Sequence, residues 1–177
     1  GKPLYDQIVQ SRFAPYTHEG RIFGLPHDVH PVMLAYRRDL FEQYGIDPDE
    51  WTTWEGFVEA GRRVTIATGG KADRFMLNLS KTDPGHFEIL LFQRGGGYFD
   101  REGNCILDSE LAVDTMKWYA RQLAGPDRIA TDTGFMGASW VKSMQDGYTL
   151  CFLCPDWLSG LTETHIAPCA NTSSSMA

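Results

Sequence analysis

Two groups of side chains have the types that bind metal ions or carry out redox chemistry. Cys151 and Cys154 stand three residues apart, which is the spacing of half a zinc site or of a redox-active pair. They fall in an apolar, strand-like run, where residues three apart point to opposite faces, and no second such pair follows. His27 and His30 flank Asp28, but in an extended segment this spacing spreads the two imidazoles apart. We therefore predict no metal site at either place and buried thiols at the cysteines, with their redox state left open.

The sequence lacks the motifs of the common catalytic sites. It contains no GxSxG nucleophile elbow, no HExxH zinc motif and no GxxxxGK[ST] phosphate loop. The glycine run 95–97 follows a predicted helix instead of a strand, so it is not a dinucleotide-binding fingerprint. The residues therefore indicate neither a cofactor nor a recognisable catalytic centre.

Aromatic residues offer a better indication of function. Five tryptophans are many for 177 residues, and an indole stacks well on the C–H face of a sugar. Trp54, Trp118 and Trp140 fall at helical positions and are predicted to be structural. Asp156 and Trp157 instead follow a buried strand, at the carboxyl end where α/β sheets usually bind ligands. This pair indicates contact with a polyol.

Composition and charge exclude several classes of protein. The 16 basic and 23 acidic residues give a net charge of -7, which argues against nucleic acid as a partner, because phosphate contacts need clustered Lys and Arg. No apolar run approaches the roughly 18 residues that a membrane-spanning helix requires. A hydrophobic content of 42% with 22 aromatic residues is sufficient for a globular core.

Hydrophobic patterning predicts short strands that alternate with helices, which is typical of the α/β class. The expected strands cover 22–25, 32–36 and 148–153, and the expected helices cover 38–44, 139–146 and the residues that follow the capping-box sequence Thr52–Glu55, Asp83-Pro84 and Asp108-Ser109.

Two segments carry more specific expectations. The helix after Asp108-Ser109 is expected to bury an apolar stripe formed by Ala112, Val113, Met116, Tyr119 and Leu123. Residues 162–177 are rich in Thr, Ser and Ala and show neither the helical nor the strand period, so we expect an irregular or non-native tail.

Six short motifs, in the same order and at similar intervals, resemble those of the extracellular solute-binding proteins (family 1) of carbohydrate ABC transporters, the maltose-binding-protein-like group. The resemblance covers about residues 15–161. The motifs are RIFGLP at 21–26, MLAYRRDLF at 33–41 with GIDP at 45–48, TWEGF at 53–57, GGYFD at 96–100, the helix opened by Asp108-Ser109, and MQDGY at 144–148 leading to CPDW at 154–157.

This resemblance implies an α/β, periplasmic-binding-protein-like (type II) fold, in which two lobes joined by a hinge enclose a solute. Residues 1–31 then form the end of the first lobe and the hinge crossing, 32–161 form an incomplete second-lobe α/β domain, and 162–177 form the tail. The chain is then expected to be a fragment, either a shortened product or a gene product whose end departs from the family pattern.

The resemblance also implies which residues face the solute: Asp28, His30, His86, Asp156 and Trp157. Asp28 and His30 lie on the same side of the polar segment if that segment is extended. His86 stands where the family often has a cleft aromatic, and an alignment slip of one residue would exchange the roles of Asp156 and Trp157.

By the same resemblance, the protein binds a small carbohydrate for an ABC importer and has the permease subunits as partners, while the missing motifs indicate no cofactor or metal. It is expected to be periplasmic or extracellular, with a soluble or a lipid-anchored full-length parent. Because half of the cleft would be missing, we expect little solute binding by this chain alone.

Two alternatives stay open. The first is a carbohydrate-active enzyme, a glycoside hydrolase that uses paired carboxylates such as Asp28 and Asp156. The second is a fragment that acts only in protein–protein interaction, through apolar surface that a shortened lobe leaves uncovered.

Overall fold

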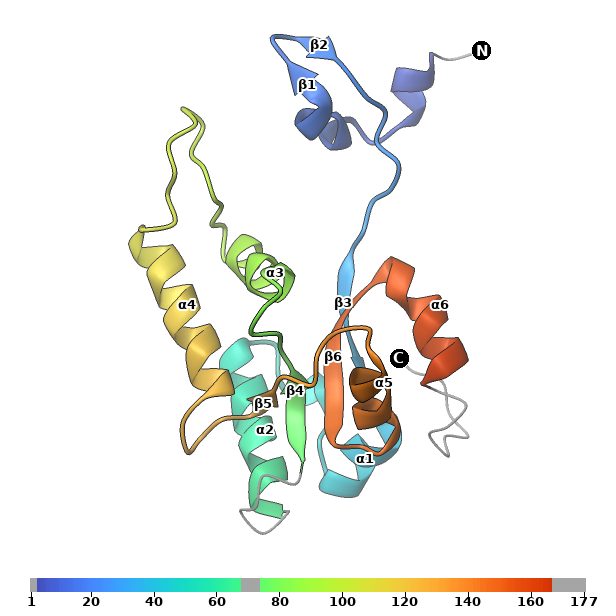
Figure 1. Ribbon diagram of the computed structural model, residues 1–177, viewed down its shortest axis with the longest axis vertical. Coiled ribbons are helices and arrows are strands. Elements are labelled where there is room, and N and C mark those ends of the chain that lie inside the picture. Colours follow the sequence, from blue (N-terminus) through green and yellow to red (C-terminus); the bar gives the residue numbers. More distant parts are fainter. Residues whose placement is uncertain (1–2, 68–73, 167–177) are drawn as a thin grey trace. The chain divides into compact units, whose positions relative to one another are not determined.

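The computed structural model describes residues 3–67 and 74–166 and divides the chain into two compact units, Gly1–Pro31 and Val32–Ala177 (Figure 1). The first unit is small. Its elements are the 3₁₀ helices η1 (Leu4–Gln7) and η2 (Gln10–Tyr16) and the two-residue antiparallel strands β1 (Thr17–His18) and β2 (Arg21–Ile22).

The first unit is organised around Phe13, which is buried and packs against the Tyr5 ring with 4.8 Å between centroids. The expected strand over 22–25 ends already at Ile22, since its partner β1 has only two residues. Arg12 donates from Nε to the carbonyl of Asp28 at 3.0 Å and so ties the polar segment to η2.

The second unit contains a four-stranded sheet with the order β3-β6-β4-β5. Strand β6 is parallel to β4 and antiparallel to β3, and β5 is parallel to β4. The strands expected over 32–36 and 148–153 are confirmed, whereas the other two strands of the sheet were not predicted. The strands are β3 (Val32–Tyr36), β4 (Phe75–Asn78), β5 (Ala130–Thr131) and β6 (Thr149–Pro155).

Helices pack on both faces of this sheet, which confirms the α/β class. One hydrophobic cluster joins the sheet to α1, α2, α3 and α4, and a second joins it to α5 and α6. None of the described helices is long and apolar enough to cross a membrane. The helices are α1 (Arg38–Tyr44), η3 (Pro48–Glu50), α2 (Trp54–Ala67), α3 (Gly85–Gln93), α4 (Glu110–Leu123), α5 (Ala138–Gln145) and α6 (Asp156–His165).

The helix termini follow local capping chemistry. Gly45 ends α1 with φ 62°, the left-handed conformation that glycine adopts at low cost. The Ser109 hydroxyl accepts the backbone N–H of Ala112 at the start of α4, as expected. The capping residue of α2 is Thr53 and not the predicted Thr52, because the Thr53 hydroxyl accepts the backbone N–H of Gly56.

The buried face of α4 differs from the expected apolar stripe. Ala112, Tyr119 and Leu123 are buried, but Val113 and Met116 are 38% and 48% exposed. Thr115 takes the inward position, since its hydroxyl donates to the carbonyl of Leu111 at 2.7 Å and so needs no water. Satisfied polar residues therefore replace apolar ones on this face.

The cysteines of β6 are buried, as predicted. Cys151 packs in the cluster under α1 to α4, and Cys154 in the cluster under α5 and α6, so the two thiols lie on opposite faces. Burial raises the pKa of both thiols, which disfavours the reactive thiolate.

The predicted tail lies mostly outside the described residues, as does Cys169. The first residues of the predicted tail, from Thr162 to His165, belong to helix α6. Thr162 is buried in this helix, and its hydroxyl donates to the carbonyl of Leu158 at 2.9 Å.

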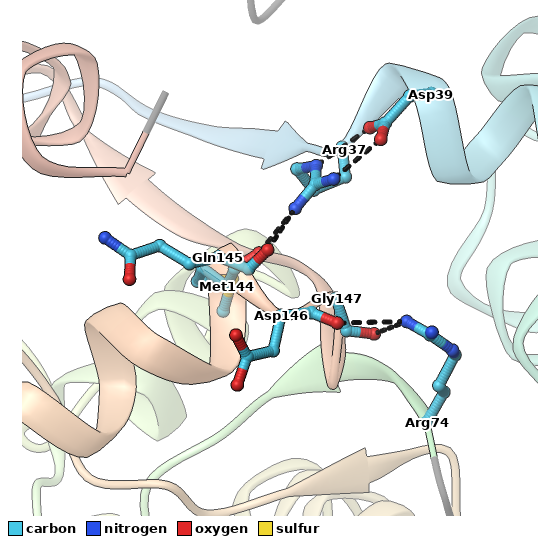
Figure 2. A network of polar contacts seen from close by, with 7 residues as sticks. All are labelled: Arg37, Asp39, Arg74, Met144, Gln145, Asp146 and Gly147. Carbon is cyan, nitrogen blue, oxygen red and sulfur yellow. Dashed lines mark hydrogen bonds and ion pairs between the residues drawn. The ribbon is translucent and has the colours of Figure 1, made fainter. Parts of the chain in front are cut away.

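Two arginines close the end of the sheet at which β4 and β6 begin and β3 ends, here called the amino end (Figure 2). Arg37 is buried, pairs with Asp39 through two hydrogen bonds of 2.8 and 2.6 Å, and donates to the carbonyls of Met144 and Gln145. Arg74 donates to the next two carbonyls, those of Asp146 and Gly147. The network fixes the turn from α5 into β6.

Candidate functional site

The opposite end of the sheet, here called the carboxyl end, is where β4, β5 and β6 finish and β3 begins. The pairing of Val32 with Pro155 and of Asn78 with Phe152 sets this alignment. Loops that follow three parallel strands thus meet at one place, which is where ligands bind in open α/β sheets.

The junction between β6 and α6 presents Asp156 and Trp157. Leu158 and Thr162, one helical turn apart, are buried and anchor α6 on the sheet. Trp157 is 49% exposed. Asp156 accepts the backbone N–H of Trp157 on Oδ1 at 2.8 Å, so its carboxylate is held at the first turn of the helix.

The loop between β4 and α3 is held from several sides through Ser80. Its backbone N–H donates to His86 Nδ1 at 3.0 Å, and its carbonyl accepts the Tyr119 hydroxyl at 2.5 Å. Its own hydroxyl accepts the N–H groups of Thr82 and Asp83. A loop with this many internal bonds presents its side chains in a fixed geometry.

His86 is only 5% exposed and packs edge-on against Phe135, with 5.3 Å between ring centroids. Burial lowers its pKa, and the charges of Asp83 and Asp132 oppose that shift. Because Nδ1 accepts a hydrogen bond, the neutral ring carries its proton on Nε2. His86 thus holds the β4–α3 loop, and Nε2 is the atom through which it would donate to a ligand.

The loop after β5 completes the carboxyl end. Asp132 accepts the N–H of Lys81 at 2.7 Å and that of Gly134 at 2.8 Å, and so joins this loop to the one after β4. The buried Asn78 side chain also holds this loop: its amide nitrogen donates to the carbonyl of Gly134, and its oxygen accepts from the backbone N–H and the hydroxyl of Thr133. Met136 has φ 59° and is 46% exposed, an uncommon conformation for a residue with a side chain.

Asp28 and His30 belong to the first unit. Asp28 Oδ2 lies 3.8 Å from His30 Nε2, and it also contacts Nδ1 of His27. Both imidazoles approach the same carboxylate oxygen, so they are less spread than the sequence spacing suggested. The two side chains are about two-fifths exposed.

In the second unit, His86 lies in the first turn of the helix that follows β4, and Asp156 and Trp157 lie in the first turn of the helix that follows β6, so all three belong to the carboxyl end of the sheet. Asp28 and His30 form a separate pair in the first unit. Carboxylates that are fixed by backbone N–H groups can accept hydrogen bonds from hydroxyl groups, and an exposed indole can stack on a sugar ring. This arrangement is suited to the recognition of a polyol.

Sequence reasoning did not find Asp132, Ser80 or Met136. No signal marked Asp132, because β5, which positions it, has only two residues. Ser80 acts through its backbone and its hydroxyl, and neither leaves a spacing pattern. The left-handed conformation of Met136 has no sequence signature either.

Comparison with known proteins identifies the family of the chain. The family model described as "Bacterial extracellular solute-binding protein" matches residues 1–142. The chain belongs to this family. The chain resembles the arabinooligosaccharide-binding protein of Bacillus subtilis (strain 168), with 27% identity over 156 residues, 88% of this chain and 35% of the relative. The lactose-binding protein of Rhizobium radiobacter is also 27% identical, over 91% of this chain and 38% of the relative.

Solved structures show the fold of this chain. The galacto-N-biose-/lacto-N-biose I-binding protein of Bifidobacterium longum matches 90% of the chain with a TM-score of 0.72 and 21% identity, and the match covers 38% of that structure. A solute-binding protein from Thermotoga lettingae, bound with α-D-tagatose, gives a TM-score of 0.73 at 20% identity, over 94% of this chain and 43% of that one. The chain therefore has part of the type II periplasmic-binding-protein fold.

The chain spans little more than a third of the length of the curated relatives named above. The expected likeness to maltose-binding-type proteins is thus confirmed, and it is a likeness to part of such a protein.

Proposed function

We propose that this chain is part of the solute-binding component of an ABC importer and forms one wall of a cleft that takes a small carbohydrate. Family membership and the sugars named for its relatives support this function. The observation that carries the proposal is Trp157, a half-exposed indole beside the fixed carboxylate of Asp156 at the carboxyl end of the sheet. The protein acts by binding, without chemical change of the solute.

Recognition rests on hydrogen bonds to hydroxyl groups and on stacking. The Asp156 carboxylate accepts from a sugar hydroxyl, His86 donates from Nε2, and the Trp157 ring covers a C–H face. A buried hydroxyl left without a partner costs about 1–3 kcal/mol, so a fixed set of acceptors distinguishes sugars that differ in one hydroxyl.

Asp28 and His30 supply a second set of contacts, from the polar segment that leads into β3. In the complete protein, closure of two lobes around the sugar would complete the set of contacts to the solute. The closed form is then what the permease subunits recognise, in the periplasm or outside the cell.

Calorimetric titration of the 177-residue chain and of a longer protein that includes both lobes tests this function. The sugars to compare are an arabinooligosaccharide, lactose, lacto-N-biose and maltose. We expect micromolar or tighter binding of at least one sugar to the two-lobe protein and no binding of that strength to the chain alone, since one wall provides only part of the contacts.

Two results would contradict the proposal. One is the absence of sugar binding by a correctly folded two-lobe protein across the whole set. The other is hydrolysis of any of these sugars that stops when Asp156→Asn is introduced, because that outcome assigns the carboxylates to catalysis.

A further inference from the structure

A cavity of about 600 Å³ lies among α2, α3 and α4 of the second unit, on elements other than the loops that carry Asp156 and Trp157. A neighbouring cavity of about 570 Å³ shares Glu55, Trp118 and Arg121 with it. The volume of the first cavity falls within the range of small-molecule sites, about 300–1,000 Å³.

The apolar part of this cavity is formed by Trp54, Trp118 and Leu90. The two indoles meet edge to face with 5.5 Å between ring centroids, and Nε1 of Trp54 donates to Gln93 at 2.9 Å. Both tryptophans are partly buried and pack against the hydrophobic cluster under α1 to α4, which holds their rings in place. Part of each side chain remains exposed. An apolar or ring-shaped body can lie on such a surface.

The polar part of the cavity is positively charged. Arg94, Lys117 and Arg121 line it together with two carboxylates, Glu55 and Asp114. Asp114 lies 3.6 Å from the ammonium of Lys117. The cavity lining thus carries a net positive charge, although the net charge of the whole chain is -7. Basic side chains are therefore concentrated at this cavity relative to the rest of the chain.

One of these cations is held in place. Nη1 of Arg94 donates to the hydroxyl of Thr115 at 2.6 Å, and that hydroxyl, on a residue only 1% exposed, donates its own hydrogen bond to the carbonyl of Leu111. A guanidinium has five N–H donors, so this contact orients the group and leaves donors for another partner. The first turn of α2, capped by Thr53, adds its backbone dipole to the same cavity.

We propose that this cavity is a second binding site, for a small organic anion whose carboxylate or phosphate group pairs with Arg94 and Arg121 while its apolar body packs on Trp54 and Trp118. The site is independent of the sugar-binding function proposed above, because it uses none of the residues at the carboxyl end of the sheet.

Titration of the 177-residue chain with phenyl phosphate, benzoate, phenol and inorganic phosphate tests this site. We expect phenyl phosphate or benzoate to bind at least tenfold more tightly than phenol or inorganic phosphate, since each of the latter offers half of the recognised chemistry. The affinity should fall as sodium chloride is raised, because salt screens the cationic side chains.

Variants assign the binding to the cavity. The double variant Arg94→Met/Arg121→Met should weaken binding of the anionic probe at least tenfold, whereas Arg101→Met, in an exposed turn, and Trp157→Ala should leave it unchanged. If circular dichroism shows that the double variant does not fold, the single change Arg121→Met, at an exposed position of α4, should still weaken binding at least threefold.

The proposal is overturned if neither phenyl phosphate nor benzoate binds, if phenol binds as tightly as they do, or if the folded arginine variants bind the anion as the unsubstituted chain does. Loss of anion binding in Trp157→Ala would also overturn it, since the anion would then occupy the sugar site.

Discussion

The two ends of the sheet use polar side chains in different ways. At the amino end, Arg37 and Arg74 donate hydrogen bonds to four successive backbone carbonyls, and Arg37 also donates to Asp39 (Figure 2). All of these groups belong to the second unit. At the carboxyl end, backbone N–H groups hold the carboxylates of Asp132 and Asp156, and Trp157 remains half exposed.

This difference separates a structural role from a recognition role. A guanidinium that is buried against carbonyls stabilises the fold and has little surface to offer a ligand. A carboxylate that is oriented by the backbone still has acceptor positions for hydroxyl groups, and an exposed indole contributes area without being needed for the core. Substitutions at the two ends should therefore affect different properties.

The largest effect on stability is expected for Arg37→Met, at the amino end. The change leaves Asp39 and the carbonyls of Met144 and Gln145 without their donor, and each buried group that loses its hydrogen-bond partner costs about 1–3 kcal/mol, so the three losses together exceed that of a single bond. Urea denaturation of the chain measures this loss. Arg101→Met, in an exposed turn, is the matched control and should change stability by less than about 0.5 kcal/mol.

A loss below about 1 kcal/mol for Arg37→Met would mean that the network is only a surface arrangement. The contrast between the two ends would then have no energetic basis.

A smaller effect is expected for Tyr119→Phe, which removes the hydroxyl that donates to Ser80 at the carboxyl end. The buried carbonyl loses its partner, which costs about 1–3 kcal/mol. In the two-lobe protein, the same change should also weaken sugar binding, since Ser80 holds the loop that carries His86. Equal stability and equal affinity in the Phe variant would show that the loop does not depend on this bond.

The two ends should also respond to different ranges of pH. Burial lowers the pKa of His86, so its contribution to stability is present above about pH 6.5, the ordinary value, and is lost as the pH falls, because the unfolded ring takes up a proton that the folded ring resists. The hydrogen bond from Arg37 lowers the pKa of Asp39, so that contribution is lost only below about pH 4.

Melting temperatures across this range test the assignment. His86→Gln should make the melting temperature less dependent on pH between about pH 7 and 5. Asp39→Asn should do so only in the more acid range, and to a smaller extent, since the Asp39 side chain is about one-third exposed. If His86→Gln retains the full slope of the unsubstituted chain, the ring is not the group that titrates.

The sequence predicted the parts of the fold that are set by local patterns. The strands over 32–36 and 148–153, the glycine end of α1 and the Ser109 cap of α4 are of this kind. The errors on α4 arose because Thr115 is buried through a bond to its own helix, which an apolar pattern does not show. Strands β4 and β5 were missed because they are strands through pairing with neighbours distant in sequence, and β5 has only two residues.

The candidate site was predicted only in part, for a related reason. The position of Asp156 and Trp157 after a buried strand is visible in the sequence and in the family resemblance. The network that supports the loops, from Ser80 through His86 and Tyr119, joins residues up to 39 positions apart, and no local pattern encodes it.

The smallest effect on stability is expected for Trp157→Ala, and it is paired with the largest effect on binding. Because the indole is half exposed and belongs to neither hydrophobic cluster, its loss should lower the free energy of unfolding by no more than about 1 kcal/mol. Tyr148→Ala is the matched control for binding, since Tyr148 precedes β6 at the amino end whereas Trp157 follows it at the carboxyl end.

The affinity of the two-lobe protein for its sugar, measured by calorimetry for Trp157→Ala and Tyr148→Ala side by side, tests most directly whether the carboxyl end faces the solute. We predict a loss of at least tenfold for Trp157→Ala, equivalent to about 1.4 kcal/mol, and no change in affinity for Tyr148→Ala. Unchanged affinity in Trp157→Ala, or an equal loss in both variants, would contradict the account.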